Sequence, residues 1–424
     1  MSRQEQQEAL RKIWSLQGFS VREVEIEGIG EPDGRHHLVK RIFVQDERKF
    51  HYCPECGKAH REGLFQEAEE RQWRDRSMGD FETWVVYAPW RISCCSGTRV
   101  ERLPWEAPGH RMTRHFFELI AALCRRLPVS EVATMARLSW DTVARIDKES
   151  ITMALGESGP SLDGLRWIGV DEVTRTGGHV YFTVVTDLVA GRVVWIGEGK
   201  KEDTLGAFFK ELGPKRCRKI VGVVSDLSAA YRAAITAAIP NAIHILDRFH
   251  IIQWVNQALD KIRRQTFGAA PADDLGRFFK VKKWMLLRAR EALSLAQKRL
   301  LGTVLSRNRN LQRAYVLKEN LRGIFHYPWE RLGSLRNAIL NWCWMATHSR
   351  LQPLIQVGQR LRENIEMVIA GFEHGIKMGL VESINGNIGQ LRREAHGYRD
   401  PEYFKLKIYQ RCSLHPDLWA SVVL

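Results

Sequence analysis

The 424-residue sequence lacks any apolar run of about 18 residues, the length that a membrane-spanning helix needs. Its first residues, Met1 to Gln7, are polar and mixed in charge, without the apolar core of a secretory signal. It also has no internal repeat and no low-complexity tract. These absences argue against a membrane partner and predict a cytoplasmic protein, whose 8 cysteines are reduced thiols or metal ligands and not disulfides.

Acidic residues are in deficit. The chain has 64 Lys and Arg against 49 Asp and Glu, a formal net charge of +15. Such an excess favours a polyanionic partner, most often nucleic acid, although a basic soluble protein without such a partner is the plainer alternative. The length predicts about two to four domains.

The N-terminal stretch, residues 1–107, alternates short apolar and polar runs, as in residues 38–44 and 83–87, which predicts strands. Two cysteine pairs lie among them. The first has the Cys-x-x-Cys-Gly spacing of a structural zinc site, whereas the second consists of adjacent cysteines, a less usual chelate. Turns without metal are the alternative, and a redox dithiol fits less well because the pair does not open a helix. The expected zinc ligands are Cys53, Cys56 and Cys94, with Cys95 or His60 as the fourth.

Residues 108–158 have a helical period and predict a helix-turn-helix. One helix begins with Ser130 as its expected N-cap, and after a tight turn a second begins at Asp141. Basic side chains flank this pattern, so we expect it to contact DNA; an ordinary pair of helices is the alternative. The expected DNA-binding residues here are Arg145 and Lys148.

Residues 159–265 predict a mixed sheet with helices. A hairpin turn is expected at Gly177 and Gly178, between the first two strands. Three consecutive strands followed by alternating helix and strand is the ribonuclease H-like order. The expected strands are 165–171, 179–187, 192–197, 219–226 and 242–247, and the expected helices are 203–212, 228–238 and 248–264.

Three acidic residues in this frame suggest a metal-dependent DNA-cutting site. Asp171 and Asp226 each end an apolar run that predicts a buried strand, and Glu382 lies far downstream in a helical segment. Two strand-end carboxylates and one helix-borne carboxylate can hold two hard cations, Mg²⁺ or Mn²⁺, about 3.5–4 Å apart. Such cations activate the attacking oxygen and stabilise the leaving oxygen of a phosphodiester.

Residues 266–372 contain almost no strand signal and predict a basic helical insertion between the second and third carboxylates. Residues 373–424 then return to the core. Arg392 and Arg393 follow Glu382 and are expected to line the path of the DNA phosphates; a solvated basic face is the alternative.

Other polar residues compete for roles in the site. Asp247 also ends an apolar run, and it either caps the next helix or supports the metal ligands from behind. His250 either positions a scissile oxygen and moves a proton, or only satisfies a backbone group. Glu172 is expected on the opposite face of its strand, Asp187 in local turn bonding, and Asp203 as a helix cap.

Together these motifs resemble the bacterial insertion-sequence transposases of the DDE class, in particular the ISL-three (ISL3) family. The resemblance covers nearly the whole chain. One departure is that residues 94–97 read Cys-Cys-Ser-Gly where the family has Cys-x-x-Cys-Gly. The segments that carry the resemblance are 167–172, 225–226, 246–250, 381–385 and 391–399.

The resemblance implies that Asp171, Asp226 and Glu382 form the catalytic triad, beside an Asp-x-x-His element made by Asp247 and His250. It also implies an enzyme that binds the terminal inverted repeats of an element and its target DNA, cleaves phosphodiesters and transfers the 3′-hydroxyl strand, as a homodimer or larger assembly on DNA. A non-catalytic DNA-binding regulator and a ribonuclease H-like repair or junction nuclease are the alternatives.

Overall fold

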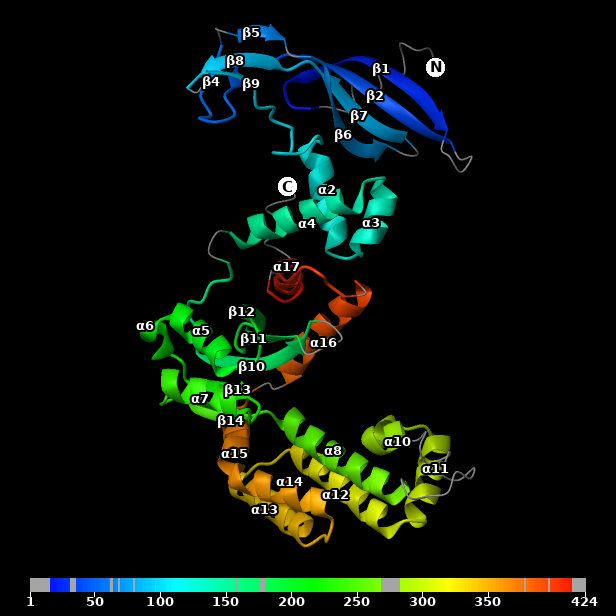
Figure 1. The fold of residues 1–424 in the computed structure, drawn as a ribbon, viewed down its shortest axis with the longest axis vertical. Coiled ribbons are helices and arrows are strands. Elements are labelled where there is room, and N and C mark those ends of the chain that lie inside the picture. Colours follow the sequence, from blue (N-terminus) through cyan, green and yellow to red (C-terminus); the bar gives the residue numbers. More distant parts are fainter. Residues whose placement is uncertain are drawn as a thin grey trace. The chain divides into compact units, whose positions relative to one another are not determined.

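The computed structural model divides into two compact units, residues 1–157 with 415–424, and residues 158–414 (Figure 1). The hairpin turn expected at Gly177 and Gly178 lies outside the described residues. The structure describes residues 16–30, 36–61, 64–67, 69–78, 81–95, 97–156, 159–175, 180–267, 283–376, 379–395 and 397–413.

The first unit begins with small antiparallel-rich sheets around a core that contains Trp73 and Trp105. The strands expected at residues 38–44 and 83–87 are confirmed within β2 and β7. One sheet has the order β1-β2-β7-β6, formed by β1 (Phe19–Gly30), β2 (His36–Asp46), β7 (Phe81–Tyr87) and β6 (Arg71–Met78). The others pair β3 (His51–Tyr52) with β4 (Ala59–His60), and β5 (Leu64–Glu67) with β8 (Trp90–Cys94) and β9 (Gly97–Val100).

Three helices complete this unit: α2 (Arg114–Cys124), α3 (Val129–Ala136) and α4 (Trp140–Leu155). The two predicted helices are thus present, but the expected cap at Ser130 is wrong. Pro128 is the N-cap residue, and because its φ is fixed the helix starts directly after it, which leaves Ser130 inside the first turn. Helix α4 starts one residue earlier than expected, because the Ser139 hydroxyl caps it by accepting from the Thr142 amide.

The second unit is built on a sheet with the order β12-β11-β10-β13-β14. Strands β10, β11 and β12 are antiparallel, whereas β13 and β14 run parallel to β10. All the expected strands and helices are confirmed within a few residues. They are β10 (Trp167–Thr174), β11 (Tyr181–Asp187), β12 (Arg192–Glu198), α5 (Glu202–Leu212), β13 (Gly222–Ser225), α7 (Ala229–Ala238), β14 (Ile243–Leu246) and α8 (Arg248–Phe267), with the short helix α6 (Pro214–Cys217) between α5 and β13.

The expectation that Asp171 ends its strand is wrong. Pairing of β10 with β11 continues past the Asp171–Val184 pair to the Thr174–Tyr181 pair, so Asp171 lies inside β10. The shorter parallel neighbour β13 does end just before Asp226. The apolar run predicted the buried part of β10, and the polar extension is stabilised by hydrogen bonds to β11 alone.

Helices cover both faces of this sheet. Ile168 and Val170 face α5 and α7, and the alternate residue Val173 faces the helices from the C-terminal part, as the two-residue period of a strand requires. These C-terminal helices are α16 (Gly379–Glu394) and α17 (Pro401–Cys412). Helix α15 (Ile365–Glu373), which precedes them, packs against β14 on the same face of the sheet (Figure 1).

Residues 283–372, the described part of the predicted helical insertion, form helices and no strand, so the predicted secondary structure is confirmed there. They pack against α8 around a core that contains Trp342 and Leu259. Within the described chain, no helix is both long and apolar enough to span a membrane. The insertion helices are α10 (Lys283–Leu287), α11 (Leu295–Ser306), α12 (Arg309–His326), α13 (Leu332–Thr347), α14 (Gln352–Glu363) and α15.

Candidate active site

Three aspartates lie side by side at one edge of the second unit's sheet. The register of β10 with β13, and of β13 with β14, continued to the strand ends, places Asp171 beside Asp226 and Asp226 beside Asp247. By strand alternation all three lie on the face of Val224 and Ile245, which α15 and α16 cover. The sheet therefore gathers carboxylates from three strands at one level.

Two of these aspartates also accept a backbone hydrogen bond close to the start of the helix that follows. Asp226 Oδ1 accepts a hydrogen bond from the Ser228 amide at 2.9 Å, and Asp247 Oδ1 accepts one from the Phe249 amide at 2.9 Å. The helix-capping role considered for Asp247 is thus confirmed. Such bonds fix the carboxylates, and the positive end of each helix dipole favours their charge.

Helix α16 lies along β10 and is joined to it at three points. Val381 packs on Gly169, where a Cβ atom would lie only 2.8 Å from Val381 Cγ2. One turn later, Asn385 Nδ2 donates to Asp171 Oδ2, and towards the end of the helix Arg392 Nη1 donates to the last carbonyl of β10 at 2.9 Å. A glycine in the strand therefore permits the close approach of this helix.

Glu382 is exposed on the first turn of α16. It precedes Asn385 by three residues, so the two side chains lie on one side of the helix. Burial raises the pKa of Asp247, and the negative charges of Asp171 and Glu382 raise it further. The four carboxyl groups of this edge are therefore close enough to influence each other.

His250 lies in the first turn of α8 with Nε2 3.6 Å from Asp171 Oδ1. Burial alone would disfavour its charged form. The nearby negative charges of Asp171, Asp247 and Asp226 outweigh burial and raise the pKa of His250 to about 9. The carboxylates therefore favour the charged form of this ring.

The carboxylates do not form a compact single-ion site: Asp171, Asp226 and Glu382 are not among the described groups whose ligand atoms all lie within 4.8 Å of one another. A site for two cations about 3.5–4 Å apart spreads its ligands more widely, because outer ligands contact different ions. Hard oxygen donors on one face of the sheet edge suit such a pair.

The cysteines do form a compact group. The thiols of Cys53, Cys56, Cys94 and Cys95 all lie within 4.8 Å of one another, although two of them are adjacent in sequence. His60 Nε2 is 3.2 Å from Cys94 Sγ, so this ring also borders the group. Hydrogen bonds from nearby backbone amides lower the pKa of the Cys53 thiol to about 7, which favours the thiolate that a soft metal binds.

A second compact group, Asp46, His51 and Glu101, is not suited to a metal. The Arg48 guanidinium lies 2.6 Å from Asp46 and 2.7 Å from Glu101. The carboxylates are therefore already neutralised by a fixed cation. The Tyr87 hydroxyl also donates to Asp46 at 2.8 Å, which indicates a structural polar network.

The competing acidic residues are placed elsewhere. Glu172 points to the opposite face, as expected, with its carboxylate 3.6 Å from Lys200 Nζ. Asp187 accepts from two amides of the following turn, also as expected. The cap expected at Asp203 is wrong: Lys201 is the N-cap residue, so Asp203 lies in the first turn of α5.

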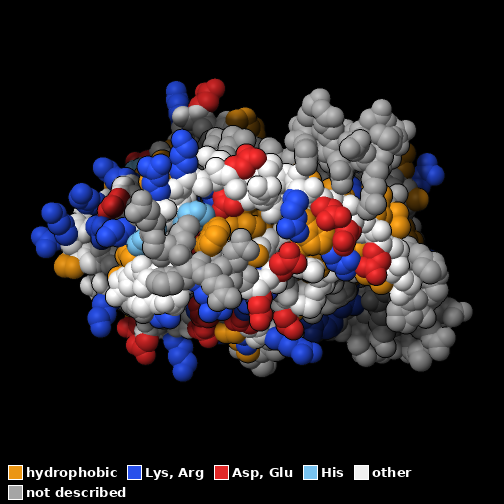
Figure 2. All heavy atoms as spheres, turned by 90° about the horizontal axis from the view of Figure 1, so that it is seen from above, with side chains coloured by type: hydrophobic (Ala, Val, Ile, Leu, Met, Phe, Trp, Pro, Cys, Tyr) orange, Lys and Arg blue, Asp and Glu red, His pale blue; other side chains and the backbone are white. Residues whose placement is uncertain are grey.

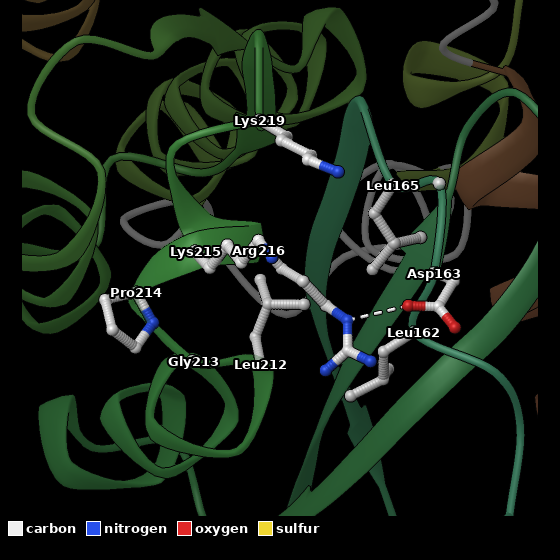
Figure 3. A pocket seen from close by; sticks show the side chains of 10 residues that line it. Leu162, Asp163, Leu165, Leu212, Gly213, Pro214, Lys215, Arg216 and Lys219 are labelled. Carbon is white, nitrogen blue, oxygen red and sulfur yellow. Dashed lines mark hydrogen bonds and ion pairs between the residues drawn. The ribbon is translucent and has the colours of Figure 1, made fainter.

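A hollow of about 440 Å³ lies where β10 and β13 begin, opposite the aspartates (Figure 3). Lys215 and Lys219 line it, and Arg216 Nε donates to Asp163 at 2.7 Å across it. It contains none of the predicted site residues. Elsewhere, Figure 2 shows cationic side chains gathered at one end of the face drawn, with Asp and Glu nearer its middle.

Comparisons with known proteins identify the family of this chain. A transposase family model, that of ISL3, matches residues 168–408, which include every residue of the carboxylate edge. The chain belongs to the ISL3 family of transposases. It is 30% identical over 403 residues to the transposase for insertion sequence element IS1001 of Bordetella parapertussis, covering 94% of this chain and 96% of that protein. It is 29% identical over 375 residues to the transposase for IS1557 of Mycobacterium tuberculosis, covering 82% and 83%.

The ISL3 helix-turn-helix domain matches residues 101–151 of this transposase, the segment that contains α2, α3 and most of α4. The predicted DNA-binding residues lie on α4: Arg145 is exposed, with Nη2 3.2 Å from His110 Nδ1, and Lys148 is half-buried. In the other unit Arg393 is exposed, whereas Arg392 is committed to a carbonyl of β10.

Sequence reasoning missed two features that lie beside the candidate site. Asn385 received no role, although its spacing of three residues from Glu382 was a usable signal. Arg360 and Trp254 were also missed: the guanidinium carbon of Arg360 lies 3.8 Å from the centre of the Trp254 ring. No sequence pattern links these two, because they come from different helices, α14 and α8.

Proposed function

We propose that this transposase cuts DNA at the ends of its insertion sequence and joins the freed 3′-hydroxyl to target DNA, by the DDE mechanism on a ribonuclease H-like core. The observation that carries the proposal is the alignment of Asp171, Asp226 and Asp247 at one sheet edge, with α16 bringing Glu382 to the same face. The strand order, three antiparallel strands followed by two parallel ones, supports the proposed core.

In this proposal Asp171, Asp226 and Glu382 hold a pair of Mg²⁺ or Mn²⁺ ions, which supply Lewis-acid activation of the attacking and leaving oxygens. Asn385 and the Glu172 amide fix the Asp171 carboxylate by hydrogen bonds to its two oxygens. His250 contributes a positive charge that orients Asp171 or the scissile phosphate. Asp247, which caps α8, supports these ligands from behind.

The first unit is proposed to recognise the element ends. Helix α4, with Arg145 and Lys148, would contact double-stranded DNA, and Arg393 would contact phosphates beside the cutting site. Cys53, Cys56, Cys94 and Cys95 would hold a structural Zn²⁺; four thiolates in a compact group match its tetrahedral preference. Because two ends are joined in one event, a homodimer or larger assembly on DNA is proposed.

The decisive experiment compares the full-length protein with an Asp171→Ala variant, using a supercoiled plasmid that carries the element ends and Mg²⁺ or Mn²⁺. The expected result is strand cleavage by the unsubstituted protein, and no cleavage but undiminished end binding by the variant. Equal cleavage by both proteins would refute the carboxylate assignment. End binding without cleavage by either protein would instead identify a DNA-binding regulator.

A further inference from the structure

Arg360 is an arginine of the helical insertion that lies beside the carboxylate edge. It stacks on Trp254, which follows His250 by one turn of α8 and so lies on the same side of that helix. His250 in turn contacts Asp171 at 3.6 Å. Asp171, His250 and the stacked pair of Trp254 and Arg360 therefore follow one another in space, with Trp254 one helical turn beyond His250.

A second contact holds α14 near this edge. Arg232 of α7, the helix that follows Asp226, donates from Nη2 to Asn364 Oδ1 at 2.9 Å. Asn364 follows α14 directly. Partial loss of water lowers the pKa of Arg360, while the negative charge of Asp226 opposes that change, which agrees with their proximity.

Among the described residues, the Arg360 guanidinium is not paired with an acidic residue, unlike those of Arg336 and Arg322. Arg336 pairs with Glu366, and Arg322 pairs with Glu291 and Glu319. In the part of the chain that the structure describes, the Arg360 guanidinium makes no ion pair or hydrogen bond. Stacking occupies the flat face of a guanidinium and leaves its N–H edge free to donate.

We propose that Arg360, held in place by Trp254, binds a phosphate of the DNA strand that enters the carboxylate site. This role rests on the function proposed above. The forked N–H groups of an arginine match two oxygens of one phosphate, a geometry that lysine cannot reproduce. A cation at this place also offsets the repulsion between the DNA backbone and four neighbouring carboxylates. The insertion thus supplies part of the substrate-binding surface, and Arg360 is a positioning residue.

The test is single-turnover cleavage of an end duplex by the full-length protein with Mn²⁺, with enzyme in excess. Arg360→Ala should slow cleavage about 10- to 100-fold, the effect of losing charge-assisted hydrogen bonds, and Arg360→Lys should recover only part of the rate. Affinity for the end should change by less than about twofold, because the helix-turn-helix supplies most of it. The matched control is Arg362→Ala, which removes an exposed arginine from the same turn of α14 and should cleave normally.

A second measurement separates phosphate binding from a structural role. The substrates are duplexes in which one phosphate near the cut is replaced by a neutral methylphosphonate, at a different position in each duplex. At one position the replacement should lower the cleavage rate of the unsubstituted protein but not lower the rate of Arg360→Ala any further. Trp254→Ala should behave like Arg360→Ala, and Trp254→Phe, which keeps an aromatic face, should be nearly normal.

Three results would overturn the role of Arg360. The first is an equal cleavage rate for Arg360→Ala and Arg362→Ala. The second is that the rate losses from Arg360→Ala and from the methylphosphonate add at every position, and the third is a rate loss explained by a lowered melting temperature. Failure of the unsubstituted protein to cleave is a different outcome. It refutes the proposed function itself, and this role with it.

Discussion

The side-chain amide of Asn385 donates a hydrogen bond to the carboxylate of Asp171, a residue 214 positions earlier in the chain. This contact joins α16 to β10 at the level where Asp226 and Asp247 also lie. It holds one oxygen of Asp171, while the Glu172 amide donates to the other at 2.7 Å. The proposed metal ligand Asp171 is therefore oriented by α16, the helix that carries the proposed ligand Glu382.

Replacing Asn385 should weaken the site without unfolding it. We expect Asn385→Ala to lower Mn²⁺-supported cleavage about 10- to 100-fold, the usual cost of losing a group that orients a metal ligand. Asn385→Asp should be worse, because it places a second negative charge against Asp171. End binding should be unchanged. Asn387→Ala, a change on the same helix, is the control; if it lowers cleavage equally, the effect is one of helix stability.

The approach of α16 to β10 depends on the absence of a side chain at Gly169. Gly169→Ala should lower the free energy of unfolding by about 1–3 kcal/mol, because the new Cβ meets Val381 at 2.8 Å and Leu188 at 3.1 Å. It should also reduce cleavage by displacing Glu382. The double change Gly169→Ala with Val381→Ala should recover part of both losses. Thermal melting and cleavage of the three variants check this, and no recovery would contradict the contact.

His244 makes stability depend on pH. Its Nε2 lies 2.7 Å from the Ser225 hydroxyl, and burial, then the charge of Arg232, lowers the pKa of His244 from 6.5 to about 4. Between pH 6.5 and pH 4, His244 is protonated in the unfolded chain but stays neutral in the folded chain. The free energy of unfolding should therefore fall by about 1.4 kcal/mol per pH unit as the pH drops from 6.5 to 4, and this contribution is constant above 6.5.

The measurement for His244 is the melting temperature of the unsubstituted protein and of His244→Gln between pH 8 and pH 4. The glutamine can still donate to Ser225 but does not titrate. The difference between the two proteins should be constant above pH 6.5 and should shift in favour of the variant below it. A constant difference across the whole range would show that this histidine is not buried in its neutral form.

Loss of the proposed zinc site and loss of the proposed Mg²⁺ or Mn²⁺ site should have separate effects. Cys53→Ser should lower zinc content from one per chain and weaken end binding, because a small metal site contributes much of the local folding energy. It should leave cleavage of nonspecific DNA with Mn²⁺ intact. Glu382→Gln should do the reverse. Comparing Cys95→Ser with His60→Ala identifies the fourth ligand: we expect zinc loss only with the cysteine. Protein purified without chelators that carries no zinc would refute the site.

The helix-turn-helix should bind DNA mainly through its charges. Arg145→Ala should weaken end binding and reduce the slope of log affinity against log salt by about one, because one phosphate contact releases about one counterion. Arg218→Ala, an exposed change in the other unit, should leave the slope unchanged. An affinity that hardly varies between low and moderate salt would contradict a phosphate-based interface.

The sequence predicted the core sheet well because its signals are local. Buried strands β13 and β14 are short apolar runs, and Asp226 and Asp247 follow them as polar residues in the turns that lead into a helix. Strand alternation alone placed Glu172 on the opposite face. The end of β10 was misjudged because a strand can continue through polar residues when its neighbour β11 supplies the hydrogen bonds.

Contacts between distant elements could not be predicted in the same way. The sequence gives no measure of the space at Gly169, which matters only once Val381 packs on it. Arg360 and Trp254 meet because α14 packs near α8, and the packing of helices depends on many side chains at once. The cap at Ser130 was wrong for a local reason: Pro128 is the N-cap residue, so the helix begins one residue before Ser130.

Because α16 lies about 200 residues after β10 in the chain, the carboxylate edge is completed late in synthesis. The ribosome synthesises the helix-turn-helix segment and the three aspartates of the sheet edge long before it reaches Glu382 and Asn385. The returning helix is thus the last part of the carboxylate edge to be made. Under the function proposed above, a chain that stops short of α16 would keep the helices proposed to bind the element ends but would lack Glu382, so we expect it to compete with the full-length protein for those ends.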